Sequence, residues 1–148
     1  MLQRLQEHHG WILALLREGD PLLAQPELRP SAAFLATRRS AMGQLLVAYQ
    51  RFLHQELFEP MIAHAMPEHA ALARVVKVDC IELVEGFRAF QRRWMAEDAV
   101  ERWNEYRPQA VRMIERLRRH IVEVDAIARK LSGAHNARPG AVEEKGTH

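Results

Sequence analysis

The sequence predicts an all-α protein with an up-down-up-down four-helix bundle. In four separate segments, apolar residues recur three and four positions apart, which is the spacing of one face of an α-helix. No segment alternates apolar and polar residues as a half-buried strand does. Short connections between long amphipathic helices are typical of antiparallel neighbours, so we expect the four segments to pack around one core.

A proline-rich connection separates the first two predicted helices. An apolar stripe predicts the first helix over residues 1–18, and Glu18-Gly19-Asp20-Pro21 interrupts it. The segment Asp20–Pro30 contains three prolines and is expected to be a connection, because proline removes a backbone donor and fixes φ. Ser31 is a candidate N-cap for the second helix, which we expect to end near Pro60 or shortly after it.

The third helix is expected to begin at Pro67, since proline is tolerated in a first helical turn, and to end at the polar pair Glu97-Asp98. Pro108 leaves two possibilities: it either kinks a long last helix or begins that helix. Ser132-Gly133 predicts the C-terminal stop of the last helix. The expected core seam of the third helix follows heptad spacing through His69, Ala73, Val76, Cys80, Leu83, Phe87, Phe90 and Trp94.

Length and composition indicate one domain without a membrane anchor. The chain has 148 residues, 48% of them hydrophobic, so we expect a single bundle domain over residues 1–131. Residues 132–148 are polar and are expected to form a disordered tail. No stretch approaches the roughly 18 apolar residues that a membrane span needs, and the first nine residues lack the pattern of a secretory signal. The expected location is the cytoplasm.

The charge pattern and the single cysteine exclude two further classes. The formal net charge is only +2 and acidic and basic residues are interleaved, so no nucleic-acid partner is expected. Cys80 is the sole cysteine, which excludes an internal disulfide, and its place on the seam predicts an inert, packed thiol. Its neighbour Asp79 lies one residue off the seam and is expected to be a boundary carboxylate paired with a nearby arginine.

An aromatic group surrounds the connection between the third and fourth helices. We expect it to close one end of the bundle, with a ligand pocket at that end as the alternative. Self-association through this tryptophan-rich end is a further possibility, so the protein is a candidate homo-oligomer. The group comprises Phe87, Phe90, Trp94, Trp103 and Tyr106.

Histidines interrupt the apolar seams of all four predicted helices. They are His9, His54, His69 and His120, one for each helix in order. A single histidine on a half-apolar face is more often packed or hydrogen-bonded than a ligand. One inward histidine from each of four helices, however, is what a bundle needs to hold a metal ion in its core. Imidazole suits iron and zinc, and carboxylates usually complete a site with two metal ions.

These positions resemble the hemerythrin-like, or HHE cation-binding, family of four-helix bundles. Leu5-Gln6-Glu7-His8-His9 looks like the first-helix histidine motif of the family, and whether His8 or His9 is the ligand stays open. Glu68-His69 resembles the histidine that opens the third helix, and His120 followed by Asp125 resembles the last-helix histidine and bridging carboxylate. The resemblance covers residues 1–131 and implies a non-haem di-iron site.

The second helix departs from the family pattern. The family expects His-x-x-x-Glu, whereas this chain has Gln50 where the histidine would stand and His54 where the carboxylate would stand. Ala73 also replaces a second third-helix histidine found in the oxygen-carrying branch. Three outcomes therefore remain open: a di-iron site, a reduced or one-metal site, and a bundle without metal. The candidate metal ligands are His9, His54, His69, His120 and Asp125.

The resemblance implies a metal-binding protein that serves oxygen binding, metal handling, or redox or nitrosative-stress sensing. Its expected cofactor is iron, and its expected small partners are dioxygen or nitric oxide. No turnover of an organic substrate is expected, so the protein is not predicted to be an enzyme. The alternative is a degenerate, metal-free bundle that acts as an interaction or regulatory module.

Overall fold

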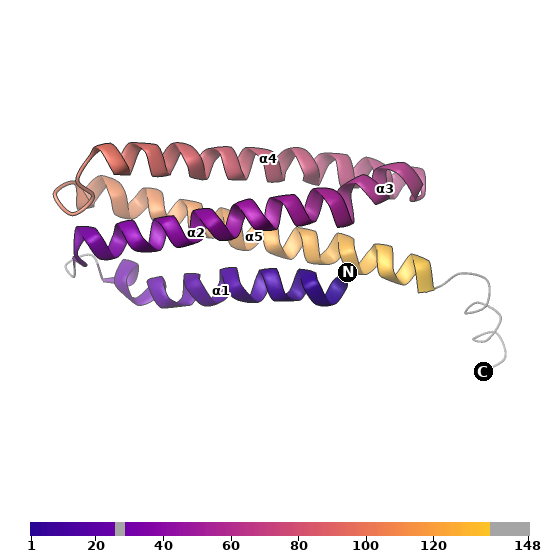
Figure 1. Cartoon of the computed structure of the whole chain (residues 1–148), viewed down its shortest axis with the longest axis horizontal. Helices are drawn as coiled ribbons and strands as arrows, with labels where there is room; N and C mark the ends of the chain where they lie inside the picture. Colours follow the sequence, from indigo (N-terminus) through magenta and orange to yellow (C-terminus); the bar gives the residue numbers. More distant parts are fainter. Residues whose placement is uncertain (26–28, 137–148) are drawn as a thin grey trace.

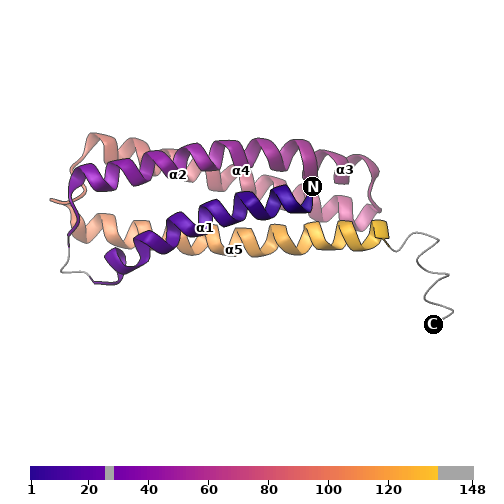
Figure 2. The ribbon, with the colours of Figure 1, turned by 60° about the horizontal axis from the view of Figure 1, so that its bottom comes forward.

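The computed structural model describes residues 1–25 and 29–136, with side chains up to residue 133. The prediction of an all-α protein is confirmed: within these residues every regular element is helical. The elements are α1 (Leu2–Ala24), α2 (Ala32–Leu53), the π-helical turn η1 (His54–Phe58), α3 (Glu59–His64), α4 (Pro67–Ala96) and α5 (Trp103–Asn136). Four of these elements are long helices. Figures 1 and 2 show the long helices side by side, with the short helix α3 at one end.

The long helices α1 and α2 run antiparallel. Arg4 near the start of α1 forms an ion pair with Glu56, just beyond the end of α2. Glu18 near the end of α1 forms an ion pair with Arg38 near the start of α2. Each of these helices also packs against one of the other two long helices, α1 against α5 and α2 against α4. The four long helices therefore enclose one core.

Helix α1 extends further than the sequence predicted. The expected interruption at Glu18–Pro21 is wrong, since α1 continues through Pro21 to Ala24. Two contacts account for the extra turn. Leu23 packs against the core, and Arg107 of α5 donates from Nε to the carbonyl oxygen of Leu23 at 2.5 Å, which satisfies one of the free acceptors at the helix end.

The second predicted helix is one continuous helical run with a π-turn in it. Ser31 is the N-cap as predicted, and its Oγ accepts a hydrogen bond from the backbone nitrogen of Phe34 at 3.1 Å. In η1 the backbone nitrogen of Glu59 bonds five residues back to the carbonyl oxygen of His54. This turn leads directly into α3, which tolerates Pro60 in its first turn. His64 is the last residue of α3.

Helices α4 and α5 form the second antiparallel pair. Trp94 near the end of α4 donates from Nε1 to Oε1 of Gln109 near the start of α5 at 3.1 Å. Pro108 lies inside α5, so the possibility that it begins the last helix is wrong. The predicted stop at Ser132-Gly133 is also wrong, because α5 continues to Asn136. The rest of the predicted tail, residues 137–148, lies outside the described residues.

The core follows the predicted seams closely. On α4 every predicted seam residue after His69 is buried, from Ala73 to Trp94. The aromatic group at the α4–α5 connection is buried too, with Trp94 2% and Trp103 1% exposed. Both tryptophans therefore pack inside the chain. Among the residues described, none of the helices is at once long and apolar enough to pass through a lipid bilayer.

Candidate functional site

A cluster of polar side chains lies in the middle of the bundle, with one contributed by each long helix. We call it the central polar cluster, and it consists of His9 on α1, Tyr49 on α2, Asp79 on α4 and His120 on α5. Tyr49 lies between the two histidines, with its ring centroid 5.4 Å from that of His9 and 5.9 Å from that of His120. Buried polar groups in proteins almost always have a hydrogen-bond partner, so the partner of each member of the cluster has to be identified.

His9 points into the core, as predicted. Its side chain is 6% exposed, and Nε2 lies 2.9 Å from the hydroxyl oxygen of Tyr49. Burial lowers the pKa of His9 to about 4; Asp125 opposes this effect, while His120 adds to it. The ring is therefore neutral at physiological pH and keeps one nitrogen lone pair. Its neighbour His8 lies instead against the rings of Trp11 and Phe52, with centroids 5.4 and 4.8 Å away.

His120 is more deeply buried than His9, at 1% exposed. Its Nδ1 lies 3.1 Å from Oδ2 of Asp79, and its Nε2 is buried without a hydrogen-bond partner in the described part of the chain. Burial lowers the pKa of His120, an effect that the hydrogen bond to Asp79 opposes. A carboxylate only accepts, so Nδ1 carries the hydrogen of the neutral ring. Nε2 consequently has a lone pair that accepts no hydrogen bond from the described residues.

Asp79 joins the cluster to the surface. Besides His120, it faces Arg116, whose Nη2 lies 3.7 Å from Oδ1. The predicted arginine partner is therefore present, and the histidine partner is an addition that the sequence reasoning missed. Cys80, the next residue, is fully buried, and burial followed by the charge of Asp79 raises the pKa of its thiol to about 12. The thiol stays protonated, in keeping with a packed, unreactive cysteine.

Asp125 lies on α5, five residues after His120. Its carboxylate is close enough to raise the pKa of that histidine, against the larger effect of burial. The side chain is 33% exposed, and Oδ2 accepts a hydrogen bond from Nε of Arg129 at 2.7 Å. Of the five predicted ligands, His9 and His120 thus both lie beside Tyr49 in the core, and the charge of Asp125 acts on His9.

His54 and His69 lie apart from this region. His54 opens η1, and its charged neighbours are Lys77 and Glu59, which respectively lower and raise its pKa beside the main lowering effect of burial. Its Nε2 is also buried without a partner among the described residues. His69 is half-buried in the first turn of α4. It lies ten residues before Asp79, which is about 15 Å along a helix at 1.5 Å per residue.

A second grouping of possible metal ligands shares His120. One ligand atom each from Asp79, His120 and Glu123 lie within 4.8 Å of one another. Glu123 is exposed, so this grouping opens to solvent at the α4–α5 surface. Its histidine atom would have to be Nδ1, because Nε2 points into the core and Nδ1 already faces Asp79. Exposed acidic groups of this kind are common on helical surfaces.

Tyr49 is the member of the cluster that sequence reasoning missed. The pattern of the second helix drew attention to Gln50 and His54 rather than to Tyr49. The structure instead places Tyr49 opposite His9, fully buried. The available signal was chemical: a tyrosine on a buried seam carries a hydroxyl that needs a hydrogen-bond partner in the core.

Comparison of the chain with protein-family models, with curated proteins and with solved structures gave no match.

Proposed function

We propose that this chain is a hemerythrin-like, up-down-up-down bundle that binds one metal ion, iron or a related transition metal, in the central polar cluster. The observation that supports it most is the bare Nε2 of His120, held in the core at 1% exposure. A buried nitrogen lone pair without a partner is unfavourable in an apolar core, and a metal ion is one of the few groups that can satisfy it.

The donors around this atom suit a transition metal. His9 and His120 provide imidazole nitrogens, Tyr49 a phenol oxygen, and Asp125 a carboxylate whose charge acts on His9. Imidazole binds iron and zinc, and a phenolate and a carboxylate favour ferric iron over softer ions. Asp79 is hydrogen-bonded to Nδ1 of His120, on the side of the ring away from Nε2. Carboxylates commonly fix the tautomer and the ring orientation of metal-binding histidines in this way.

One metal ion fits these residues better than two. Two cations held close together need bridging carboxylates to offset their charge. Within the described residues, Asp125 is the one carboxylate whose charge affects the pKa of His9. The charged neighbours of His54 are Lys77 and Glu59, and His69 lies in the first turn of α4, ten residues before Asp79. The proposed ligand set therefore retains His9, His120 and Asp125 from the sequence prediction, adds Tyr49, and leaves out His54 and His69.

The metal-free alternative also has an observation in its favour. The hydrogen bond between His9 Nε2 and the hydroxyl of Tyr49 already satisfies both groups without a metal. In that case the bundle serves as an interaction or regulatory module. With metal, the biological role we propose is binding of dioxygen or nitric oxide, metal handling, or redox sensing in the cytoplasm, without turnover of an organic substrate.

The first experiment measures metal content in protein purified without a polyhistidine tag. Elemental analysis and an absorption spectrum are recorded after reconstitution with ferrous iron and exposure to air. We expect about one iron per chain and a visible band from a ferric phenolate, which Tyr49→Phe removes and His120→Gln weakens. His69→Gln is the matched control and should change neither quantity. Two irons per chain would overturn the one-metal proposal, and no iron would leave the metal-free module.

A further inference from the structure

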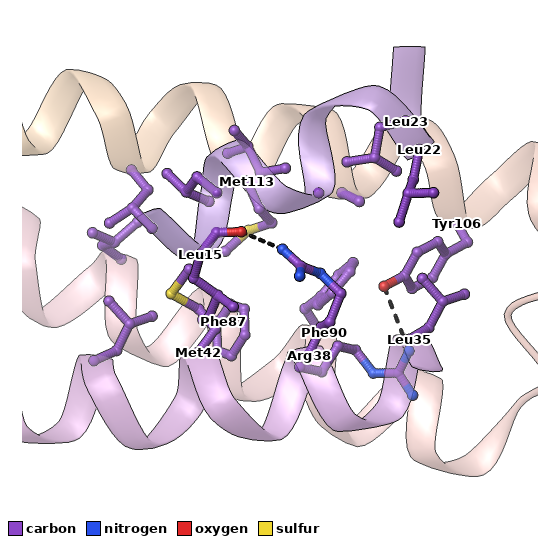
Figure 3. Close-up of a pocket in the computed structure, with 18 residues that line it drawn as sticks. Leu15, Leu22, Leu23, Leu35, Arg38, Met42, Phe87, Phe90, Tyr106 and Met113 are labelled. Atoms are coloured by element: carbon purple, nitrogen blue, oxygen red, sulfur yellow. Dashed lines mark hydrogen bonds between the residues drawn. The ribbon is translucent and has the colours of Figure 1, made fainter. Parts of the chain in front are cut away.

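A separate apolar cavity of about 100 Å³ lies toward the other end of the bundle. Figure 3 shows it between the second half of α1, the first half of α2 and the facing parts of α4 and α5. Its polar end is remote from the proposed metal site, since Arg39 lies ten residues, or about 15 Å along α2, from Tyr49, whereas Leu46 and Leu117 at the opposite end of its wall are one helical turn from Tyr49 and His120. Its apolar wall includes Leu16, Leu35, Met42, Phe87, Phe90 and Met113.

A cationic side chain is buried in the wall of this cavity. Arg39 is only 9% exposed, and its Nη2 donates to the carbonyl oxygen of Trp94 at 3.1 Å. Its Nη1 donates to the hydroxyl oxygen of Tyr106 at 3.4 Å, and the guanidinium carbon lies 5.6 Å from the centre of that ring. In the described part of the chain, no carboxylate comes within 4.0 Å of this guanidinium.

The second arginine at the cavity differs in this respect. Arg38 forms an ion pair with Glu18 at 3.1 Å and donates to the carbonyl oxygen of Leu15 (Figure 3). Its charge is therefore compensated within the chain, whereas the charge of Arg39 is not. A buried charge without a counter-ion is strongly unfavourable, and arginine is the residue type best suited to bind a carboxylate.

Tyr106 adds a second donor at the same place. Arginine can only donate, so the hydroxyl oxygen of Tyr106 is the acceptor in its bond with Arg39, and the phenol hydrogen remains available. A guanidinium has five N–H groups, of which Arg39 uses two in the bonds above. Donors from both residues thus converge beside an apolar space.

We propose that this cavity binds a small apolar carboxylate, with the carboxylate held by Arg39 and Tyr106 and the hydrocarbon part in the apolar space. The size of the cavity limits the ligand. An apolar cavity of about 150 Å³ holds benzene, so about 100 Å³ suits a hydrocarbon group of about four carbon atoms. The ligand class that we propose is therefore a short, branched or linear aliphatic acid.

The test uses 3-methylbutanoate, which carries a four-carbon apolar group, and follows backbone amide shifts of the full chain by NMR. All samples contain a chelator, so that binding of the acid to a metal ion cannot imitate the result. We expect saturable shifts at the cavity with a Kd on the order of 1 mM, as befits so small a ligand. The neutral isostere 3-methylbutanamide should bind at least about tenfold more weakly, because it lacks the charge that Arg39 compensates.

Two variants complete the test. Arg39→Met should weaken binding of 3-methylbutanoate at least about tenfold, whereas Arg92→Met, which removes an exposed arginine outside the cavity, should leave it unchanged. Ala110→Leu places a larger side chain in the cavity wall and should abolish binding in a folded protein. Equal affinity for the acid and the amide, unchanged affinity in Arg39→Met, or no saturable shifts for the acid would each overturn the proposal.

Discussion

The hydroxyl of Tyr49 and Nε2 of His9 form a buried hydrogen bond of 2.9 Å that joins α2 to α1. Both side chains are buried, so water cannot replace the lost hydrogen bond if one of the two groups is removed. Burial raises the pKa of Tyr49 well above its ordinary value, which keeps the phenol protonated in the metal-free protein. The pair is thus neutral and satisfied before any metal binds.

Removing the hydroxyl should destabilise the metal-free protein. Tyr49→Phe leaves the shape of the core almost unchanged but strips Nε2 of His9 of its partner. The expected loss in free energy of unfolding is about 1 to 3 kcal/mol, the usual penalty for an unsatisfied buried polar group. Urea unfolding of wild type and variant in the presence of a chelator measures this. Equal stability would mean that His9 finds another partner or that water reaches it.

The free energy of unfolding should also fall as the pH is lowered from 6.5 to about 4, the interval over which the protonation of His9 differs between the unfolded and the folded chain. The pKa of His9 is lowered from 6.5 to about 4, so between these values the unfolded chain binds a proton that the folded chain does not. The folded state is therefore favoured above pH 6.5 and loses this advantage as the pH falls toward 4. Between pH 7.5 and pH 5 the loss from His9 alone is about 2 kcal/mol.

The check on this pH dependence is the difference between wild type and His9→Gln. The variant should lose less stability over the same range, while His64→Gln, at an exposed position, should behave as wild type does. Burial also lowers the pKa of His120, so a smaller dependence of the same sign should remain in His9→Gln. A pH profile that is identical in wild type and His9→Gln would contradict the burial of a neutral imidazole at this position.

Asp79 should act on metal affinity through His120 rather than as a ligand. Asp79→Asn removes the carboxylate that fixes the hydrogen on Nδ1 and so the lone pair on Nε2. Loss of such a supporting carboxylate typically lowers metal affinity about 10- to 100-fold. Competition with a chromophoric chelator measures the affinity. Glu85→Gln, on the exposed face of α4, is the control.

Glu123→Gln distinguishes the core site from the surface grouping of Asp79, His120 and Glu123. If the metal binds at Nε2 of His120, loss of Glu123 should leave the affinity unchanged. If instead Asp79, Nδ1 of His120 and Glu123 hold the metal, Glu123→Gln should weaken binding as much as Asp79→Asn does. The second result would place the site on the α4–α5 surface.

The helices could be predicted from the sequence because apolar spacing is a local and repeated signal. Each of the four long helices was expected close to its observed place, and His9 and His120 were expected on the inner side of theirs. The errors lie at the helix ends. Pro21 and Gly133 both interrupt helices by intrinsic preference, yet the helices continue past them, in the first case with support from a contact made by distant Arg107.

The composition of the site was harder to predict because it depends on helix phase. A shift of one residue rotates a side chain by about 100° around the axis, enough to exchange Gln50 for Tyr49 as the residue that faces His9. The π-turn that begins at His54 adds a further local change of phase, which no spacing rule anticipates. The bare Arg39 charge likewise arises from packing between distant helices and leaves no mark in the pattern of one helix.

His54→Leu separates the proposed ligand set from the one that the sequence predicted. Nε2 of His54 is buried without a partner among the described residues, and its charged neighbours are Lys77 and Glu59 rather than His9 or His120. Replacing an unpaired polar group by an apolar one of similar size should be neutral or should stabilise the chain by up to about 1 kcal/mol. Iron affinity should not change, because His54 is outside the proposed set. A marked loss of affinity in a variant of undiminished stability would return His54 to the site, and with it a second-helix histidine ligand of the kind that the family resemblance implies.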